Sequence, residues 1–165
     1  MSNINKLLLK KISEIDDFDD KLDIFLRSLN EELVTWRDYE ERGGKFVIPN
    51  PIAGFAALDG DNIIAITYFG HKKRNLFEYI FWLLFSERET ETGAIVKKEY
   101  QRKGINRRFR DLKIEYMKEL GYKRNIIRID KTNIAAINGL EKSKTAIKSG
   151  EDDDAVYYFR DLTRK

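Results

Sequence analysis

The first 50 residues alternate between apolar and polar positions in a pattern that mainly favours helices. Residues 7–12 form an apolar run that predicts an opening strand. Asp16 or Asp17 is the expected cap of the helix that follows, and a second helical stretch is expected to end at Gly43-Gly44. The apolar face of the first helix is formed by Phe18, Leu22, Phe25, Leu26 and Leu29, and that of the second by Leu33, Trp36 and Tyr39.

Beyond residue 50 the apolar residues gather in short runs that are typical of strands. Strands are predicted over 52–58, 63–69, 90–96 and 123–129. The first two are joined by Asp59-Gly-Asp-Asn62, which has the composition of a hairpin turn. Residues 76–85 are so continuously apolar that periodicity does not separate a buried strand from a short buried helix, and we favour a strand.

Two more helices and a closing hairpin complete the pattern. From Ile105 apolar residues recur at helical spacing until Gly121, which is the expected stop. A shorter helix is predicted over 133–142, with Thr132 or Asp130 as its cap. The last two strands, 145–148 and 155–162, would form a hairpin around an acidic run, 151–154, that we interpret as a solvated tip rather than an amine-binding pocket.

Composition suits one domain and excludes several kinds of site. The chain has 165 residues, 42% of them hydrophobic, which is enough for a core of its own. There is no cysteine, so disulfides, thiolate zinc sites and cysteine nucleophiles are excluded. His71 is the single histidine and cannot build a metal cluster or a histidine triad, so no metal is expected.

Charge and hydropathy favour a soluble protein. The 31 basic and 28 acidic residues nearly balance, so the net charge of +3 is weak support for a polyanionic partner. The N-terminus lacks the order of a secretory signal, and the longest nearly apolar run, 76–85, is far shorter than the about 20 residues of a membrane-spanning helix. We therefore expect a cytoplasmic protein with no membrane contact.

The segment from Val96 to Asn106 has the properties of a phosphate-binding loop. An apolar strand end runs into a cationic turn that contains Gly104, and the helix from Ile105 follows directly. A helix N-terminus offers unpaired N–H groups and the positive end of the helix dipole. Glycine in the turn removes the side chain that would block close approach to the backbone. A pyrophosphate group fits these demands.

These residues resemble the GNAT superfamily of acyl-CoA-dependent N-acyltransferases. The signature loop of that family, Gln/Arg-x-x-Gly-x-Gly/Ala, is similar to Gln101-Arg-Lys-Gly-Ile-Asn106, with Asn106 in place of the last Gly/Ala. Its later motif, Asn-x-x-Ala-x-x-x-Tyr-Glu-Lys, is similar to Asn133-Ile-Ala-Ala-Ile-Asn-Gly-Leu-Glu-Lys142. The likeness is clear over 61–142 and undetectable in the first 50 residues.

The resemblance implies a fold, a cofactor and a reaction. The fold is α/β, with a mixed central β-sheet flanked by helices in a single domain, 1–165. Residues 1–50 would be a variable N-terminal strand and helices, and residues 51–165 a hairpin, a cofactor-binding core and a C-terminal hairpin. The reaction is transfer of an acetyl group from acetyl-CoA to a primary amine of a small molecule or protein, without a metal.

The resemblance also implies which residues hold the cofactor. Backbone N–H groups from Arg102 to Arg107 would cradle the pyrophosphate, and strand 90–96 would pair with the pantetheine arm as with an added strand. Asn133 would support the cofactor from the other side. The expected cofactor-binding residues are Ile95, Val96, Lys97, Gln101, Arg102, Lys103, Gly104, Ile105, Asn106, Arg107 and Asn133.

Catalysis requires a base for the amine and protonation or stabilisation of the departing thiolate. Glu91 and Glu89 are the candidate bases, although the acidic stretch 86–91 is also compatible with an exposed turn. Leu140 stands where many family members carry the Tyr that is thought to protonate the thiolate. The alternative proton donors are Tyr158, Tyr157, Tyr79 and water.

Two other functions stay open. Because Leu140 replaces the usual Tyr, the chain could be a catalytically weak or silent acyl-CoA-binding sensor. A nucleic-acid-binding domain is the third interpretation, but the balanced charge favours attraction of the cofactor's phosphates. The sequence leaves open the acceptor amine, the acyl length and whether the chain forms a homodimer. The basic cluster is formed by Lys97, Lys98, Arg102, Lys103, Arg107, Arg108, Arg110 and Lys113, of which Arg108, Arg110 and Lys113 are also compatible with a solvated helix face.

Overall fold

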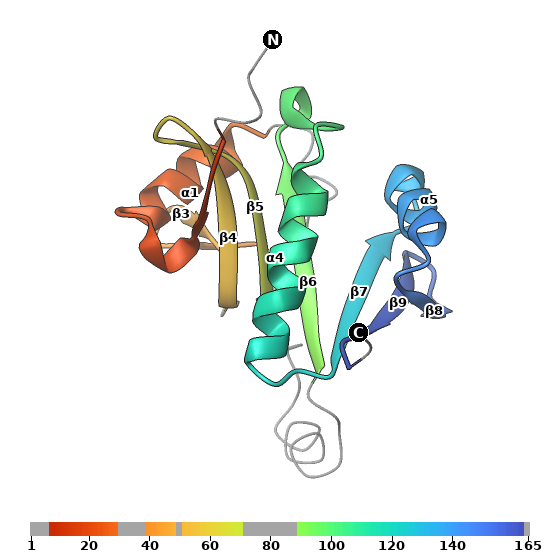
Figure 1. Cartoon of the computed structure of the whole chain (residues 1–165). Coiled ribbons are helices and arrows are strands. Elements are labelled where there is room, and N and C mark those ends of the chain that lie inside the picture. Colours follow the sequence, from red (N-terminus) through yellow and green to blue (C-terminus); the bar gives the residue numbers. More distant parts are fainter. Residues whose placement is uncertain (1–6, 30–38, 49–50, 71–88, 164–165) are drawn as a thin grey trace. The chain divides into compact units, whose positions relative to one another are not determined.

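The computed structural model describes residues 7–29, 39–48, 51–70 and 89–163 (Figure 1). The chain forms two compact units. Unit 1 comprises Met1–Phe69 and Gly93–Lys113, and unit 2 comprises Gly70–Thr92 and Ile114–Lys165. The predicted apolar positions Leu33 and Trp36 and the predicted strand 76–85 lie outside the described residues.

The described residues form a large mixed sheet. Its strands are β1 (Leu8–Lys11), β4 (Pro51–Asp59), β5 (Asn62–Gly70), β6 (Glu89–Val96), β7 (Arg124–Asp130), β8 (Ile147–Glu151) and β9 (Ala155–Asp161). The order across this seven-stranded sheet is β1-β4-β5-β6-β7-β9-β8. β6 and β7 pair in parallel, whereas β1 and β4, β7 and β9, and β8 and β9 pair antiparallel. The predicted mixed α/β architecture is therefore confirmed.

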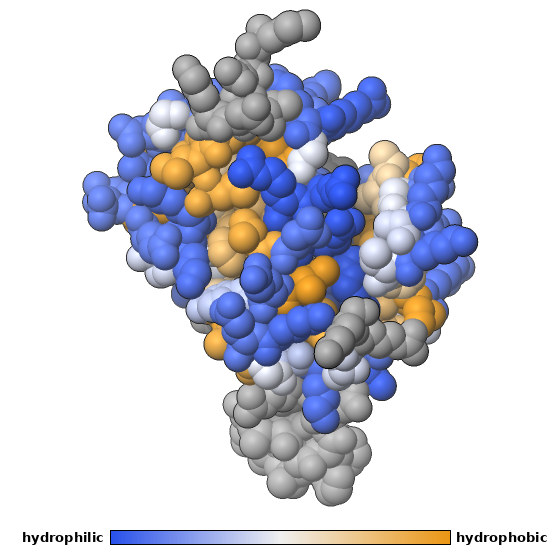
Figure 2. Space-filling view, in the orientation of Figure 1, coloured by the Kyte–Doolittle hydropathy of each residue, from blue (hydrophilic) through white to orange (hydrophobic). Residues whose placement is uncertain are grey.

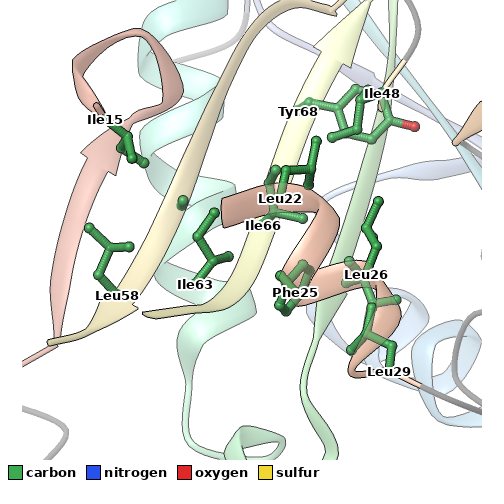
Figure 3. Close-up of a cluster of buried hydrophobic side chains, with 12 residues drawn as sticks. Ile15, Leu22, Phe25, Leu26, Leu29, Ile48, Leu58, Ile63, Ile66 and Tyr68 are labelled. Carbon is green, nitrogen blue, oxygen red and sulfur yellow. The ribbon is translucent and has the colours of Figure 1, made fainter. Parts of the chain in front are cut away.

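The core of unit 1 lies between the helix α1 (Phe18–Arg27) and the sheet (Figure 3). Leu22 and Phe25 of α1 are each 1% exposed and belong to one cluster with Ile66 of β5 and Ile95 of β6. This is the helix face predicted from the apolar spacing. Burial of each such side chain is worth about 1.5–3 kcal/mol, so the cluster holds α1 against the strands.

The helix α4 (Ile105–Glu119) begins where the sequence predicts and ends just before Gly121. Gly121 has a φ of 77°, and its N–H donates to Lys118 O at 3.0 Å. The N–H of Tyr122 donates to Met117 O, also at 3.0 Å. This pair of bonds satisfies the last carbonyls of the helix, and the left-handed backbone that it requires favours glycine.

Unit 2 contains β7, β8, β9 and the helix α5 (Ile134–Ser143). β7 pairs with β9 along its full length, from Arg124 opposite Asp161 to Asp130 opposite Ala155. β8 forms the edge of the sheet and is exposed at every residue. The predicted closing hairpin is confirmed, with strand bounds that differ by a few residues from the prediction.

A hairpin replaces the helix end that was predicted at Gly43-Gly44. β2 (Glu40–Arg42) and β3 (Lys45–Val47) pair antiparallel with Arg42 opposite Lys45, which leaves the two glycines as the turn. Their φ angles are 58° and 79°. A two-residue turn with both φ angles positive matches the twist of the flanking strands. The same two glycines suit a helix stop, which explains why the prediction was wrong.

The cap position of α1 is Asp17, one of the two predicted, whereas the predicted cap of α5 is wrong. Asp17 does precede α1, but its φ of 52° is outside the extended region of a capping residue and its side chain makes no cap hydrogen bond. At α5 the cap is Asn133, whose Oδ1 accepts from the N–H of Ala136 at 3.1 Å. Asp130 instead accepts from the N–H of Thr132 at 2.9 Å, which forms the turn before the cap.

The surface in Figure 2 is mostly hydrophilic, with smaller apolar patches between the polar residues. Among the described residues no helix is long and apolar enough to cross a bilayer. Among the described residues of unit 1, Leu8, Ile24 and Ile52 are large apolar side chains that remain exposed.

Candidate functional site

The predicted phosphate loop connects β6 to α4 in unit 1. After β6 ends at Val96, a short 3-10 turn spans Lys98–Tyr100, and α4 begins at Ile105. Two residues of the loop are left-handed: Arg102 with a φ of 59° and Gly104 with a φ of 77°. Left-handed residues turn successive N–H groups toward one side, which is the geometry of anion-binding backbone concavities.

The N–H groups at the start of α4 are available to a ligand. The first intrahelical bonds are those from Arg107 and Arg108 to Gly104 O, at 3.1 and 3.2 Å. Within the part of the chain that the structure describes, the N–H groups of Gly104, Ile105 and Asn106 donate to no acceptor. They lie at the positive end of a 15-residue helix, where an anion is stabilised.

Glycine is favoured at position 104 mainly because the backbone there is left-handed, with a φ of 77°. A Cβ on Gly104 would meet no atom within 4 Å, so the space beside it is open. The predicted approach of a phosphate to this part of the backbone stays a prediction. At Arg102 a non-glycine residue adopts the left-handed conformation, which costs about 1–2 kcal/mol. Such strain is often found at functional sites.

Two side-chain hydrogen bonds hold the loop against the sheet. Gln101 Nε2 donates to Val96 O at 3.2 Å and so ties the loop to the end of β6. The hydroxyl of Tyr100 donates to Asp59 Oδ2 at 2.6 Å, in the turn between β4 and β5. The hydrogen bond to Asp59 and the burial of the ring raise the pKa of Tyr100. The ammonium group of Lys103 lies 4.7 Å from the Tyr100 ring centroid.

The basic cluster is only partly a solvated surface. Arg102, Arg107 and Arg108 are exposed around the loop, whereas Arg110 pairs with Asp111 at 2.9 Å. Lys113 is only 9% exposed, which contradicts its interpretation as part of a solvated face. Its position explains the difference. It follows Ile105 and Phe109 at intervals of four residues and therefore falls on the buried stripe of the helix.

β6 is held to β5 in unit 1. The N–H of Lys97 donates to Ile64 O at 2.9 Å, and the hydroxyl of Thr67 donates to Gly93 O at 2.8 Å. Ile95 and Val96 are buried, and Lys97 at the strand end lies 5.8 Å from the ring centroid of Phe25. The three predicted pantetheine-binding positions are therefore backbone positions of a well-anchored strand.

The structure places both candidate bases at the start of β6. Glu89 is in parallel register with Arg124 of β7, and Glu91 with Ile126. Both residues thus belong to a strand, and the alternative of an exposed turn at these two positions is excluded. Among the described residues no group of three or more potential metal ligands lies together.

Comparison with known proteins identifies the fold. No protein-family model and no curated protein matches the sequence. Solved structures do match over nearly the whole chain. A GNAT family acetyltransferase from Staphylococcus aureus Mu50 is 14% identical with a TM-score of 0.66, and the match covers 94% of this chain and 100% of that one. This chain has the GNAT fold.

Two further structures support the assignment. A GNAT family acetyltransferase from Streptococcus pneumoniae is 14% identical with a TM-score of 0.65, over 94% of this chain and 98% of that one. A ribosomal-protein-S5-alanine acetyltransferase from Vibrio fischeri is 17% identical with a TM-score of 0.65, over 95% and 92% of the two chains. At these identities the likeness shows the fold of this chain.

The predicted proton donors of unit 2, Tyr158 and Tyr157, both donate hydrogen bonds to carboxylates. The hydroxyl of Tyr158, a residue 1% exposed, donates to Glu141 Oε1 at 2.9 Å. Burial, and next the neighbouring Glu141, raise the pKa of Tyr158. Tyr157 donates to Asp152 Oδ2 at 2.6 Å. Leu140 is half-buried on α5, and Tyr79 lies outside the described residues.

Sequence reasoning missed two residues near the predicted phosphate loop and β6. Asp59 was interpreted only as part of a turn, yet it anchors Tyr100, 41 residues away. Tyr68 was interpreted only as part of strand 63–69, yet its ring lies against Gly93 of β6. The apolar pattern contains no signal for either contact, because both depend on how distant strands are placed side by side.

Proposed function

We propose that this chain is an N-acetyltransferase that moves an acetyl group from acetyl-CoA to a primary amine. The observation that carries the proposal is the loop between β6 and α4. Its N–H groups from Gly104 to Asn106 are unpaired among the described residues, and the loop is tied to the sheet through Gln101 and Tyr100. A site whose donors already point outward binds a phosphate without first reorganising.

The loop would hold the pyrophosphate of the cofactor. The backbone of Arg102 to Arg107 supplies N–H donors, and the exposed guanidinium groups of Arg102, Arg107 and Arg108 attract the phosphates. Lys103 adds a further cation beside Tyr100. Gln101 acts by fixing the loop on Val96 O. Asn133 is also proposed to contact the cofactor, because it begins the segment 133–142 that is similar to the later family motif.

The strand β6 would hold the pantetheine arm. Ile95 and Val96 at the end of β6, and Lys97 directly after it, would offer backbone groups next to the loop. An extended ligand can pair with such a strand as a further strand would. The backbone of Ile95 to Lys97 would then face the thioester and the pantetheine arm.

Glu91 or Glu89 would remove a proton from the attacking amine, directly or through water. The neutral amine attacks the thioester carbonyl, the carbon–sulfur bond breaks, and the thiolate of coenzyme A leaves. Because an unperturbed thiol has a pKa near 8.5, this thiolate is a fair leaving group even without a strong acid. If Tyr158 served as the acid, its hydroxyl would have to exchange Glu141 for the thiolate.

The first test is binding followed by turnover. Titration calorimetry with acetyl-CoA should give a saturable site, and acetyl-CoA should raise the melting temperature because it binds the native state. Release of free thiol is then measured with a panel of amines that includes spermidine and a lysine-rich peptide. Absence of any acetyl-CoA binding would refute the proposal. We expect the active protein to be cytoplasmic and to need neither a metal nor nucleic acid.

A second candidate function is a silent acyl-CoA-binding sensor. Leu140 at the position of the usual Tyr is the observation that favours it. The same two measurements separate the candidates. A sensor binds acetyl-CoA and releases no thiol with any amine, whereas the enzyme turns over with at least one.

A further inference from the structure

Strand register places Arg128 on the same face of the sheet as the position of Glu91, a proposed base. Glu91 of β6 is the register partner of Ile126 of β7, and such partners lie on one face of the sheet. Arg128 is the next residue of β7 on the face of Ile126. With about 3.3 Å per residue and about 4.8 Å between strands, the Cα atoms of Glu91 and Arg128 are about 8 Å apart. Both residues belong to unit 2.

This face of the sheet is opposite to the one that contacts α5. The hydroxyl of Tyr158 on β9 donates to Glu141 of α5 at 2.9 Å, so Tyr158 marks the face toward the helix. Because side chains alternate along a strand, Tyr157 and Phe159 lie on the other face, where Tyr157 is the register partner of Arg128. The face that carries Arg128 therefore also carries two half-buried aromatic rings.

Arg128 is exposed, and the interaction that holds it leaves most of its donors available. Its guanidinium interacts with the hydroxyl of Tyr157, which itself donates to Asp152 Oδ2 at 2.6 Å. A guanidinium has more N–H donors than one hydroxyl can accept. Within the described ranges no carboxylate pairs directly with Arg128. The Arg128 charge is therefore held in place and can still bind an anion.

Two carboxylates act on the charge of Arg128 from nearby, and each has donors of its own. Asp152 Oδ1 accepts from the N–H of Ala155 at 2.7 Å, while its other oxygen accepts from the tyrosine hydroxyl. Asp130 Oδ1 accepts from the N–H and the hydroxyl of Thr132, at 2.9 and 2.6 Å. Both carboxylates stabilise turns and reduce the affinity of Arg128 for an anion only at a distance.

Arg124 lies on the same face of β7 but has acidic register partners. They are Glu89 on β6 and Asp161 on β9, so a carboxylate residue is paired with Arg124 on each side. The register partner of Arg128 on β9 is Tyr157. Of the two arginines on this face, Arg128 is therefore the one suited to an external anion, and Arg124 is its matched control.

We propose that Arg128 binds the carboxylate of the acceptor, which makes the acceptor an amino acid. This inference rests on the proposed function, in which Glu91 can take the proton of the attacking amine. An amino acid that presents its amine to the position of Glu91 can present its carboxylate to Arg128. A guanidinium binds a carboxylate through two parallel N–H groups. A polyamine has no anionic group for this site, and its other cations are repelled by Arg128.

The test compares pairs of acceptors that differ by one carboxylate. Each common amino acid is assayed beside the amine that lacks its α-carboxylate, for example phenylalanine beside phenethylamine. The measurement is release of free thiol from acetyl-CoA. We expect wild type to have a kcat/KM at least about tenfold higher for the amino acid in one or more pairs, since hydrogen bonds between two charged groups are strong.

Arg128→Gln removes the charge and the planar fork at an exposed position. The ratio of kcat/KM within a pair should fall about 10- to 100-fold in this variant. Differences in the intrinsic reactivity of the two acceptors cancel, because the same pair is compared in both proteins. Arg128→Lys keeps the charge without the fork and should lose part of the preference. Arg124→Gln should keep the ratio of wild type.

Each result decides the inference. A ratio that is unchanged in Arg128→Gln, or that falls equally in Arg124→Gln, overturns it and leaves the proposed function standing. Turnover only with amines that lack a carboxylate has the same meaning. If acetyl-CoA binds and neither amino acids nor amines are acetylated, the inference is wrong and the sensor is supported. If acetyl-CoA does not bind, the inference and the proposed function are both wrong.

Discussion

At the residue scale, the proposed cofactor loop contains a glycine with left-handed backbone, Gly104. Gly104→Glu should abolish the rise in melting temperature that acetyl-CoA causes, because it places bulk and negative charge in the open space where a phosphate approaches. The measurement is the thermal shift with and without acetyl-CoA.

Gly43→Glu is a control matched in strain. Gly43 also has a positive φ, 58°, and a Cβ added to it would meet no atom within 4 Å, but it belongs to the turn between β2 and β3. Gly43→Glu should lower the melting temperature of the protein without ligand by about as much as Gly104→Glu does. It should keep the full rise in melting temperature that acetyl-CoA causes. A Gly104→Glu protein that binds acetyl-CoA like wild type would contradict the assignment of the loop.

The two glutamates at the start of β6 carry the second prediction at this scale. If Glu91 or Glu89 removes the amine proton, its change to Gln should lower kcat about 10²-fold near neutral pH and leave the affinity for acetyl-CoA unchanged. Gln keeps the size of the side chain and loses only its basicity. Equal turnover in wild type and in both single variants would assign proton removal to another group or to water.

At the element scale, the loop is positioned by a turn from elsewhere in the chain. Tyr100→Phe removes the hydrogen bond to Asp59 and should weaken acetyl-CoA binding about 3- to 10-fold, which corresponds to the loss of one hydrogen bond. KM should rise with kcat unchanged, because Tyr100 is proposed to act only by holding the phosphate loop. Calorimetry and steady-state kinetics give the two values.

A double-mutant cycle tests this hydrogen bond further. It adds the single variant Asp59→Asn and the double variant with Tyr100→Phe. Asn at position 59 keeps an acceptor oxygen, so we expect a smaller loss than in Tyr100→Phe. The double variant should be no weaker than Tyr100→Phe alone, since the same bond is removed once. Additive losses would show that Asp59 and Tyr100 act on the loop independently.

The attachment of the β2–β3 hairpin to α1 should become weaker at low pH. Asp23 accepts from Arg27 Nε at 2.9 Å and from the N–H of Phe46 at 2.8 Å. The hydrogen bond from Arg27 and then that from Phe46 lower the pKa of Asp23 below its ordinary 3.8. A lowered pKa means that the charged carboxylate stabilises the fold above pH of about 4. This contribution is lost as pH falls through the folded-state pKa.

Asp23→Asn should therefore lower the free energy of unfolding at neutral pH. The difference from wild type should shrink as pH falls below the ordinary pKa of a carboxyl group, because wild-type Asp23 is then protonated too. Urea unfolding at several pH values measures this difference. Asp16→Asn, exposed before α1, is the control. A difference that stays constant down to low pH would contradict the role of the Asp23 charge.

At the scale of the whole molecule, the GNAT fold leaves open whether the chain is an enzyme or a sensor. Leu140→Tyr should keep a similar affinity for acetyl-CoA. In an enzyme it should raise turnover if thiolate protonation limits the rate, and otherwise change nothing. A sensor should stay silent, since one hydroxyl cannot position an amine for attack. Thiol release by wild type and variant against the same amines is the measurement, and robust wild-type turnover would eliminate the sensor.

The sequence by itself determined the features that arise from local chemistry. Apolar periodicity predicted α1, α4 and most strands within a few residues, because a helix or strand that buries one face must repeat its apolar residues with the matching period. The loop around Gly104 was also predictable. The apolar strand end, the glycine and the helical spacing from Ile105 are all local signals, so the strand-loop-helix could be predicted, while its role in phosphate binding stays a prediction.

Only the tertiary structure decided the features that depend on distant neighbours. Gly43-Gly44 suits both a helix stop and a hairpin turn, and the pairing of β2 with β3 selected the turn. The contact of Asp59 with Tyr100 and the position of Tyr68 over Gly93 depend on strand register and on packing between segments far apart in the chain. Local pattern contains no information on such contacts, because many registers satisfy the same alternation of apolar and polar residues.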